Sequence, residues 1–217
     1  MKESPAIDPE QFIRAVQPLL ERRDVSGLHT LLKSRWSCDN LRTLLHSDHL
    51  DAKKVGLLCL AMIGTECSIG DVALELKHRD KMVNEMAEHA LWSIWFRMGS
   101  PVANHELMRG AQALERKDIP HAIRHFDRAI EQSPQFAEPY NQRAIARYLL
   151  EDFQPSITDC ERAIERMPCH FGALAGMGHC YAHLGKAREA VEAYERALAV
   201  NPHLECVRQT VEELKNR

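Results

Sequence analysis

The sequence lacks the features that mark several large classes of protein. Its net charge is −3, so the charge balance favours neither nucleic acid nor an anionic membrane surface as a partner. It contains only 10 glycines and 10 prolines, too few for a collagen-like or disordered chain. Its longest apolar runs, such as 57–63, are far shorter than the roughly 20 residues that cross a bilayer. We therefore expect a folded, soluble chain with no nucleic-acid or membrane partner.

The amino-terminal segment and the cysteines bear on the cellular compartment. Residues 1–5 are polar and include a proline, whereas a signal peptide needs an apolar run of at least about seven residues. The chain has 7 cysteines, an odd number, and none are spaced as Cys-x-x-Cys. Most of them fall within helical patterns, where a free cysteine behaves as a small buried hydrophobe. We predict reduced thiols and a cytoplasmic protein.

No catalytic or cofactor motif is present, neither a Gly-x-Ser-x-Gly elbow nor a glycine-rich phosphate loop. Two histidine pairs, His121/His125 and His179/His183, have the i, i+4 spacing that places two imidazoles on one helix face. Neither pair has a third ligand fixed by the sequence, and no His-Glu-x-x-His motif occurs. We therefore predict no cofactor, no metal site and no enzyme activity. A metal-dependent enzyme built on the histidine pairs stays open as an alternative.

The sequence does contain one phrase three times, at 126–134, 160–168 and 194–202. Each copy holds an acidic residue, arginine and alanine in the same order, ends in proline, and begins 34 residues after the copy before it. Other small residues keep this period: Gly110, Ala144 and Gly178; Ala122, Ser156 and Ala190; Ala129, Ala163 and Ala197. A fixed period of this size indicates a helical-repeat architecture. Small residues let two helices approach closely, and proline ends each unit.

This pattern resembles the tetratricopeptide repeat, which reads Trp-x2-Leu-Gly-x2-Tyr, then Ala-x3-Phe, then Pro. The third unit fits best, with Leu174, Met177, Gly178, Tyr181, Ala190, Tyr194 and Pro202. The first helix of the first unit fits least, because Glu106 and Arg109 replace large apolar residues. The resemblance implies a domain over 101–217, with antiparallel helix pairs at about 103–136, 137–170 and 171–202. It also implies a right-handed superhelix, and the amphipathic segment 203–217 is the expected capping helix.

Residues 1–100 show a weaker period of 31 residues. Leu41 and Leu45 recur as Val72 and Leu76, and Val55, Cys59, Leu60 and Ile63 recur as Met86, Ala90, Leu91 and Ile94. Each unit is predicted to hold a short helix and a longer one, at 39–46 and 50–63 and again at 70–78 and 81–98. The pattern resembles short HEAT repeats, with a generic helical bundle as the alternative. An earlier helix should begin at Asp8 and Pro9 and should kink or split at Pro18.

The clearest helix stop in the chain, Gly99-Ser100-Pro101, separates the two predicted domains, 1–100 and 101–217. Trp92, Trp95 and Phe96 form one aromatic stripe just before it. We expect the stripe to fill the core where the first half meets the first tetratricopeptide helix, the alternative being an exposed docking surface. The fold prediction is all-α: a helical-repeat solenoid of antiparallel helix pairs, with about 12 to 14 helices and no sheet.

The resemblance also implies a function, since the first helix of each tetratricopeptide unit lines a concave groove that binds peptides. The partner-binding positions map to Leu107, Met108, Ala111, Asn141, Gln142, Ile145, Tyr148, Ala175, His179 and His183. One branch of the family holds a terminal carboxylate with lysine, arginine and asparagine, and this chain lacks the cations there. We expect a non-catalytic scaffold that binds a partly apolar peptide or protein segment. The alternative is a regulatory or accessory subunit of a larger enzyme complex.

Overall fold

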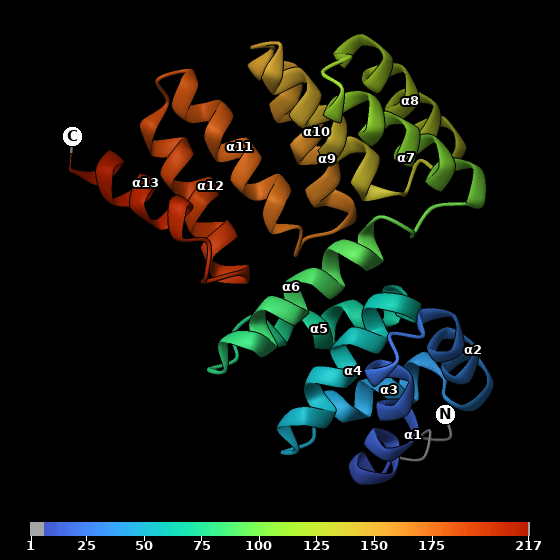
Figure 1. Cartoon of the computed structure of the whole chain (residues 1–217). Coiled ribbons are helices and arrows are strands. Elements are labelled where there is room, and N and C mark those ends of the chain that lie inside the picture. Colours follow the sequence, from blue (N-terminus) through green and yellow to red (C-terminus); the bar gives the residue numbers. More distant parts are fainter. Residues whose placement is uncertain (1–6, 217) are drawn as a thin grey trace. The chain divides into compact units, whose positions relative to one another are not determined.

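The structure is a computed structural model, and it describes residues 7–216. These residues form 13 α-helices and one short 3-10 helix, with no strand among them (Figure 1). The predicted all-α fold is therefore confirmed. The chain divides into two compact units, Met1–Ile94 and Trp95–Arg217, and each is described by itself.

The N-terminal unit begins with α1, which Asp8 caps by accepting a hydrogen bond from the backbone N–H of Glu10. The sequence predicts a kink or a split at Pro18, and the split is wrong, because one helix continues through this residue. Pro18 stands in the last turn, where its missing N–H removes only one hydrogen bond before the helix ends. The unit contains α1 (Pro9–Glu21), α2 (Val25–Arg35), α3 (Cys38–Leu45), α4 (Leu50–Ile63), η1 (Glu66–Ser68), α5 (Ile69–Glu75) and most of α6 (Lys81–Trp95).

Helices α3 and α4 begin 31 residues before α5 and α6, so the period of the apolar residues is also the period of the helices. Leucines from α3 and α4 form much of the core of this unit and are fully buried, among them Leu41, Leu57 and Leu60. One half-buried ion pair ties α4 to α5: Lys53 Nζ lies 2.9 Å from Glu75 Oε1. Helix α6 ends at Trp95, three residues earlier than the period predicted.

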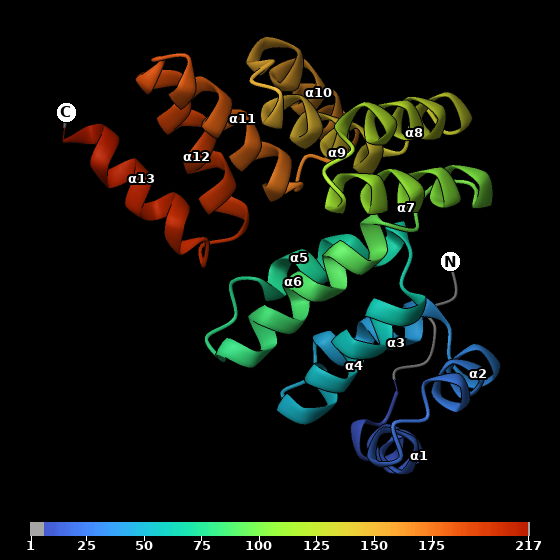
Figure 2. The same cartoon turned by 45° about the horizontal axis from the view of Figure 1, so that its top comes forward.

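The C-terminal unit consists of three antiparallel helix pairs and a final helix (Figure 2). The helices are α7 (Pro101–Glu115), α8 (Ile119–Gln132), α9 (Ala137–Leu149), α10 (Phe153–Arg166), α11 (Phe171–His183), α12 (Ala187–Val200) and α13 (Glu205–Lys215). The second helices of the pairs begin 34 residues apart, as the repeated phrase predicts. The turn inside each pair uses one left-handed residue at the same place: Lys117, Glu151 and Gly185, with φ of 61°, 61° and 71°.

Small residues hold the helices of each pair together. Ala129, Ala163 and Ala197 are all fully buried, as the sequence predicts. In the third pair the ring of Tyr194 lies directly on Gly178, because a methyl group added there would be 2.5 Å from Tyr194 Cδ1. Gly110 and Phe126 pack in the same way in the first pair, and the middle pair has Ala144 and Cys160 at these positions.

The aromatic stripe packs differently from the sequence expectation. Trp95 is buried, and its ring stacks on His170 with centroids 4.2 Å apart and an interplanar angle of 15°. It also contacts Phe171, at 5.3 Å between centroids. Trp95 therefore packs where the third helix pair begins, and Phe96 packs on the core of the first pair.

Candidate functional site

Four of the predicted groove residues line one small cavity of about 90 Å³: Asn141, Ile145, Tyr148 and His179. Helix α9 contributes positions 141, 144, 145 and 148, which share one helical face, and α11 contributes Gly176 and His179. Ser156 and Cys160 of α10 form the rest of the lining and are buried. The repeat period thus brings residues far apart in sequence to a single mostly apolar depression between the first helices of the second and third pairs.

Tyr148 is the largest side chain at this cavity, and its neighbours fix its ring. Its hydroxyl lies 2.8 Å from His183 Nε2. Its ring centroid is 5.7 Å from that of Phe153 and 5.3 Å from that of His183, and these two rings stack on each other. Burial raises the pKa of the Tyr148 hydroxyl. The ring is therefore half-buried and held in place, not fully open to solvent as expected.

His179 stands beside the cavity with one ring nitrogen already engaged. Its Nδ1 is 2.7 Å from the hydroxyl of Tyr194, a side chain that is almost fully buried. Burial of the ring and the neighbouring His183 lower the pKa of His179, so the neutral imidazole is favoured. In the tautomer where the Tyr194 hydroxyl donates to Nδ1, the ring hydrogen is on Nε2, which can then donate to a ligand.

The amides of Asn141 and Gln142 are not available in the way the sequence suggested. Asn141 is 2% exposed and Gln142 is 9% exposed, and both donate to Glu138 Oε1, at 3.2 and 2.7 Å. The other carboxylate oxygen of Glu138 is 2.8 Å from His170 Nε2. Because His170 Nδ1 accepts from the backbone N–H of Ala173, its Nε2 bears a hydrogen and donates to Glu138. The two amides thus donate their hydrogen bonds to a buried carboxylate of the protein itself.

The other predicted positions separate into core and surface. Leu107 is fully buried against the core of the first pair, and Ala175 is 9% exposed. Leu107 is therefore a packing residue, which corrects its assignment to the groove. Met108 and Ile145 are exposed large hydrophobic residues, Ala111 is half-buried, and His183 is exposed.

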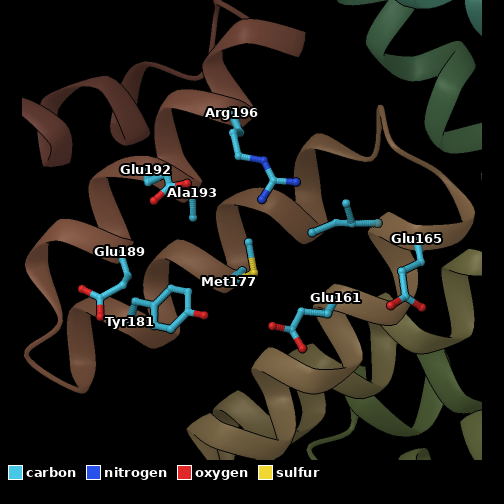
Figure 3. A pocket seen from close by; sticks show the side chains of 9 residues that line it. Glu161, Glu165, Met177, Tyr181, Glu189, Glu192, Ala193 and Arg196 are labelled. Atoms are coloured by element: carbon cyan, nitrogen blue, oxygen red, sulfur yellow. The ribbon is translucent and has the colours of Figure 1, made fainter.

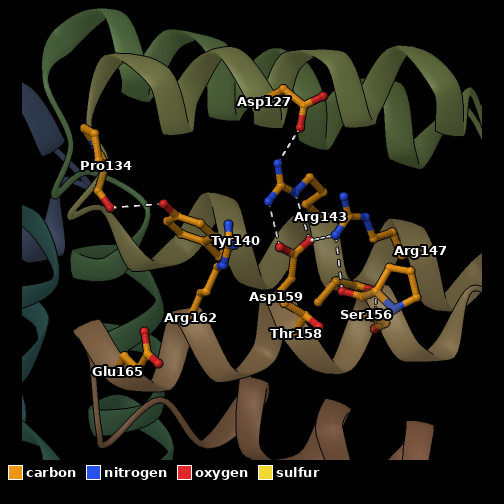
Figure 4. A network of polar contacts seen from close by, with 12 residues as sticks. Asp127, Pro134, Tyr140, Arg143, Arg147, Ser156, Thr158, Asp159, Arg162 and Glu165 are labelled. Atoms are coloured by element: carbon orange, nitrogen blue, oxygen red, sulfur yellow. Dashed lines mark hydrogen bonds and ion pairs between the residues drawn. The ribbon is translucent and has the colours of Figure 1, made fainter.

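Sequence reasoning missed an ion network across the middle pair (Figure 4). Arg143 of α9 is buried and donates from Nε and Nη2 to the two oxygens of Asp159, at 2.8 and 2.7 Å. Its Nη1 pairs with Asp127 of α8, and Arg147 Nη1 lies 2.8 Å from Asp159. One signal could have revealed it: Arg143 and Asp159 occupy positions that are apolar in the third unit, Met177 and Ala193.

Each histidine of the two i, i+4 pairs has a partner of its own. His121 Nδ1 is 2.8 Å from Asp118, and His125 Nδ1 is 2.7 Å from Glu106. His179 and His183 contact tyrosine hydroxyls. Within residues 7–216 no cluster of three histidine, cysteine, aspartate or glutamate residues is arranged to hold a metal ion. In the same part of the chain, no helix combines the length and apolar character needed to cross a membrane.

Comparison with known proteins agrees with this architecture. The family model of the tetratricopeptide repeat matches residues 172–204. A TPR repeat-containing protein of Rhizobium etli is 32% identical over 108 residues, which are 50% of this chain and 53% of that protein. Small glutamine-rich tetratricopeptide repeat-containing protein 2 of Saccharomyces cerevisiae is 33% identical over 93 residues, 43% of this chain and 27% of that protein. The chain thus matches about half of the first relative and a smaller part of the second.

Solved structures show the same fold. The first TPR domain of Spaghetti has a TM-score of 0.53 at 21% identity and covers 54% of this chain and 93% of that one. The TPR2B domain of yeast Sti1 has a TM-score of 0.51 at 24% identity and covers 54% of this chain and 98% of that one. The C-terminal unit therefore has the fold of an α-helical solenoid. More particularly, its fold is that of solved TPR domains, and residues 172–204 match the family model of the tetratricopeptide repeat.

Proposed function

We propose that this chain is a non-catalytic interaction protein whose C-terminal unit binds an extended segment of a protein partner along α7, α9 and α11. The observation that carries the proposal is the apolar cavity between α9 and α11, which Tyr148 and His179 line. The exposed Ile145 lines the same cavity, and the exposed Met108 of α7 supplies further apolar surface on the first helices. Exposed apolar side chains around a preformed depression are typical of protein-binding surfaces.

Two of the similar domains support this proposal. The first TPR domain of Spaghetti is bound to an HSP90 peptide, and the TPR2B domain of Sti1 is in a complex with pHsp70. This chain lacks lysine and arginine at the groove positions that resemble a carboxylate clamp. We therefore propose an internal, partly apolar segment as the ligand. A short aliphatic side chain enters the cavity, and His179 Nε2 donates to a backbone carbonyl.

Replacing Tyr148 by alanine tests the groove. We expect the Tyr148→Ala protein to bind its partner about 30-fold more weakly, roughly 2 kcal/mol, because it loses the largest anchor of the cavity. Partners are captured from a native lysate and identified by mass spectrometry, and their affinity for the purified variants is then measured.

The matched control is His125→Ala, which removes a ring from α8, outside the cavity. A partner that loses affinity for His125→Ala but not for Tyr148→Ala places the binding site elsewhere and refutes the proposal. A partner that is an enzyme and co-purifies in a fixed ratio would make the chain an accessory subunit, the alternative that the sequence left open.

We also propose that residues 1–100 form a HEAT-like domain and that the chain is cytoplasmic. Support for the first comes from the two short-then-long helix pairs, α3–α4 and α5–α6, which are offset by 31 residues. Support for the second comes from the free cysteines, because reduced thiols are typical of cytosolic proteins.

A further inference from the structure

A second and larger cavity, of about 380 Å³, is lined by residues of α10, α11 and α12 (Figure 3). Met177, Tyr181 and Ala193 contribute to its apolar floor, and its rim carries Glu161, Glu165, Glu189, Glu192 and Arg196. Successive residues of a helix turn by about 100°, so 177 and 181 share one side of α11, opposite Gly176 and His179. We call this cavity the acidic pocket. It opens between the second helices of two neighbouring pairs, α10 and α12.

The rim of the acidic pocket has an excess of negative charge, with four carboxylates and one guanidinium. In the described part of the chain Glu161, Glu189 and Glu192 form no ion pair, and Glu165 lies 3.7 Å from Arg166. Burial raises the pKa of the Tyr181 hydroxyl, and the charges of Glu161, Glu189 and Glu192 raise it further. The negative charge of these carboxylates therefore affects a side chain that lines the pocket, the Tyr181 hydroxyl.

One repeat earlier, a side chain of the protein itself occupies the equivalent groove between α8 and α10. The residue 34 positions before Met177 is Arg143, whose guanidinium lies between Asp127 and Asp159 (Figure 4). The same offset relates Asp127 to Glu161. The acidic pocket thus keeps a carboxylate where the earlier groove has one.

The two arginines of α9 that contact Asp159 in the earlier groove have no cationic counterparts in the acidic pocket. Arg143 corresponds to Met177 and Arg147 corresponds to Tyr181. Asp159, the carboxylate that both arginines contact, corresponds to Ala193. The acidic pocket is therefore the same groove without its internal guanidinium, and its rim carries more carboxylates than its one arginine can balance.

We propose that the acidic pocket binds an arginine side chain of a protein partner, with the guanidinium at the place that Arg143 occupies one repeat earlier. The guanidinium pairs with Glu161 and with the glutamates of α12, and its methylene stem packs on Met177 and Tyr181. A guanidinium presents five donors in a fixed planar fork that can form paired hydrogen bonds with carboxylates, whereas an ammonium is a compact point charge. A cation already lies near the Tyr181 ring, since Lys186 Nζ is 5.9 Å from its centroid.

The test uses a fluorescein-labelled peptide, Gly-Ser-Leu-Arg-Leu-Ser-Gly, and two analogues with citrulline or lysine in place of arginine. Fluorescence anisotropy is measured with the whole chain at low and at physiological salt. We expect saturable binding of the arginine peptide, and binding of the citrulline peptide about tenfold weaker or more, because citrulline keeps the shape but not the charge. We expect the lysine peptide to bind more weakly than the arginine peptide.

Two triple variants separate the pocket from the overall charge. Changing Glu161, Glu189 and Glu192 to glutamine should weaken binding of the arginine peptide by about tenfold. The matched control changes Glu131, Glu212 and Glu213, which are exposed glutamates outside the pocket, to glutamine. It makes the same change in net charge and should alter affinity by less than about twofold.

A third variant fills the pocket with a side chain of the protein itself. Met177→Arg combined with Ala193→Asp copies the arginine and aspartate of the earlier groove, and we expect it to keep its helicity and to lose the arginine peptide. Equal losses in the two triple variants would overturn the proposal. So would equal binding of the citrulline peptide, equal or tighter binding of the lysine peptide, or no saturation by the arginine peptide up to about 1 mM.

Discussion

In the C-terminal unit, the two helices of the first and third pairs pack on each other in one way, and those of the middle pair pack in another. In the first and third pairs an aromatic ring of the second helix lies on a glycine of the first, Phe126 on Gly110 and Tyr194 on Gly178. The middle pair has Ala144 and Cys160 there and adds a buried ion network. One repeat fold thus accepts either packing, provided that the residues change together.

Asp159→Ala should have the largest effect on this comparison. Asp159 is 1% exposed and accepts hydrogen bonds from Arg143 and Arg147. Its removal takes away the bidentate partner of the buried Arg143 and leaves the ion pair with Asp127, and breaking a buried ion pair costs about 3–5 kcal/mol. We expect the free energy of unfolding, measured by urea titration, to fall by that order.

The control for this prediction is the double variant Arg143→Met with Asp159→Ala. It copies Met177 and Ala193 of the third pair and removes both buried charges. We expect it to be more stable than Asp159→Ala alone, because a buried pair can often be replaced by apolar residues without loss. If the double variant is no more stable, the ion pair is not what distinguishes the middle pair.

Gly178→Ala tests the outer pairs and should have a smaller effect. The new methyl group would stand 2.5 Å from the ring of Tyr194, and such overpacking costs about 1–3 kcal/mol, part of it offset by the helix propensity of alanine. Gly176→Ala on the same helix is the matched control, because its methyl group would meet only Cys160 Sγ, at 3.5 Å. We expect that control to be neutral or stabilised by up to about 1 kcal/mol. Equal unfolding midpoints for the two variants would contradict the packing account.

The smallest expected effect is the contribution of His179 to the pH dependence of stability. The equivalent residue in the middle pair is Ile145, which does not titrate. The pKa of His179 is lowered in the folded protein, mainly by burial, so the unfolded chain binds the proton more readily. Stability should therefore fall as the pH drops below the unfolded value of about 6.5, until the folded pKa is passed.

His179→Ile is the control for that measurement, because it installs the residue of the middle pair and cannot titrate. Thermal unfolding midpoints of both proteins are compared between pH 7 and pH 5. We expect a slightly larger loss for the unchanged protein, since the imidazole is partly open to solvent and its burial is incomplete. Parallel curves would show that His179 contributes nothing to the pH dependence.

The sequence predicts the helix pairs well because each period repeats residues with a direct backbone or packing role. Alanines that let helices approach and prolines that end a unit recur in phase, so the second helices could be placed closely. The period also puts Asn141, Tyr148 and His179 on one surface, which they share in the structure.

What a period cannot reveal is whether a neighbouring side chain already occupies a position. Leu107 and Gln142 fall on the groove face by register, yet one packs in the core and the other donates to Glu138. The partner that holds Glu138 in place, His170, lies just before the next helix pair and outside the repeated phrase. The contacts that decide whether these groove positions are exposed run between neighbouring helix pairs. They depend on residues, such as His170, that do not recur with the 34-residue period.

The stacking of Trp95 on His170 has a consequence for how this unit can be shortened. In an array where each helix contacts mainly its neighbours, the end pair is free to fray. Here Trp95 precedes the first pair but contacts His170 and Phe171, which follow the second pair. Because of this contact, fraying of the first pair alone is disfavoured. A fragment that begins at Pro101, the boundary drawn from the sequence, lacks Trp95 and exposes the imidazole that holds Glu138. Truncation at Pro101 would destabilise the packing around His170 and Glu138, whereas a fragment that starts a few residues before Trp95 keeps the contact between Trp95 and His170.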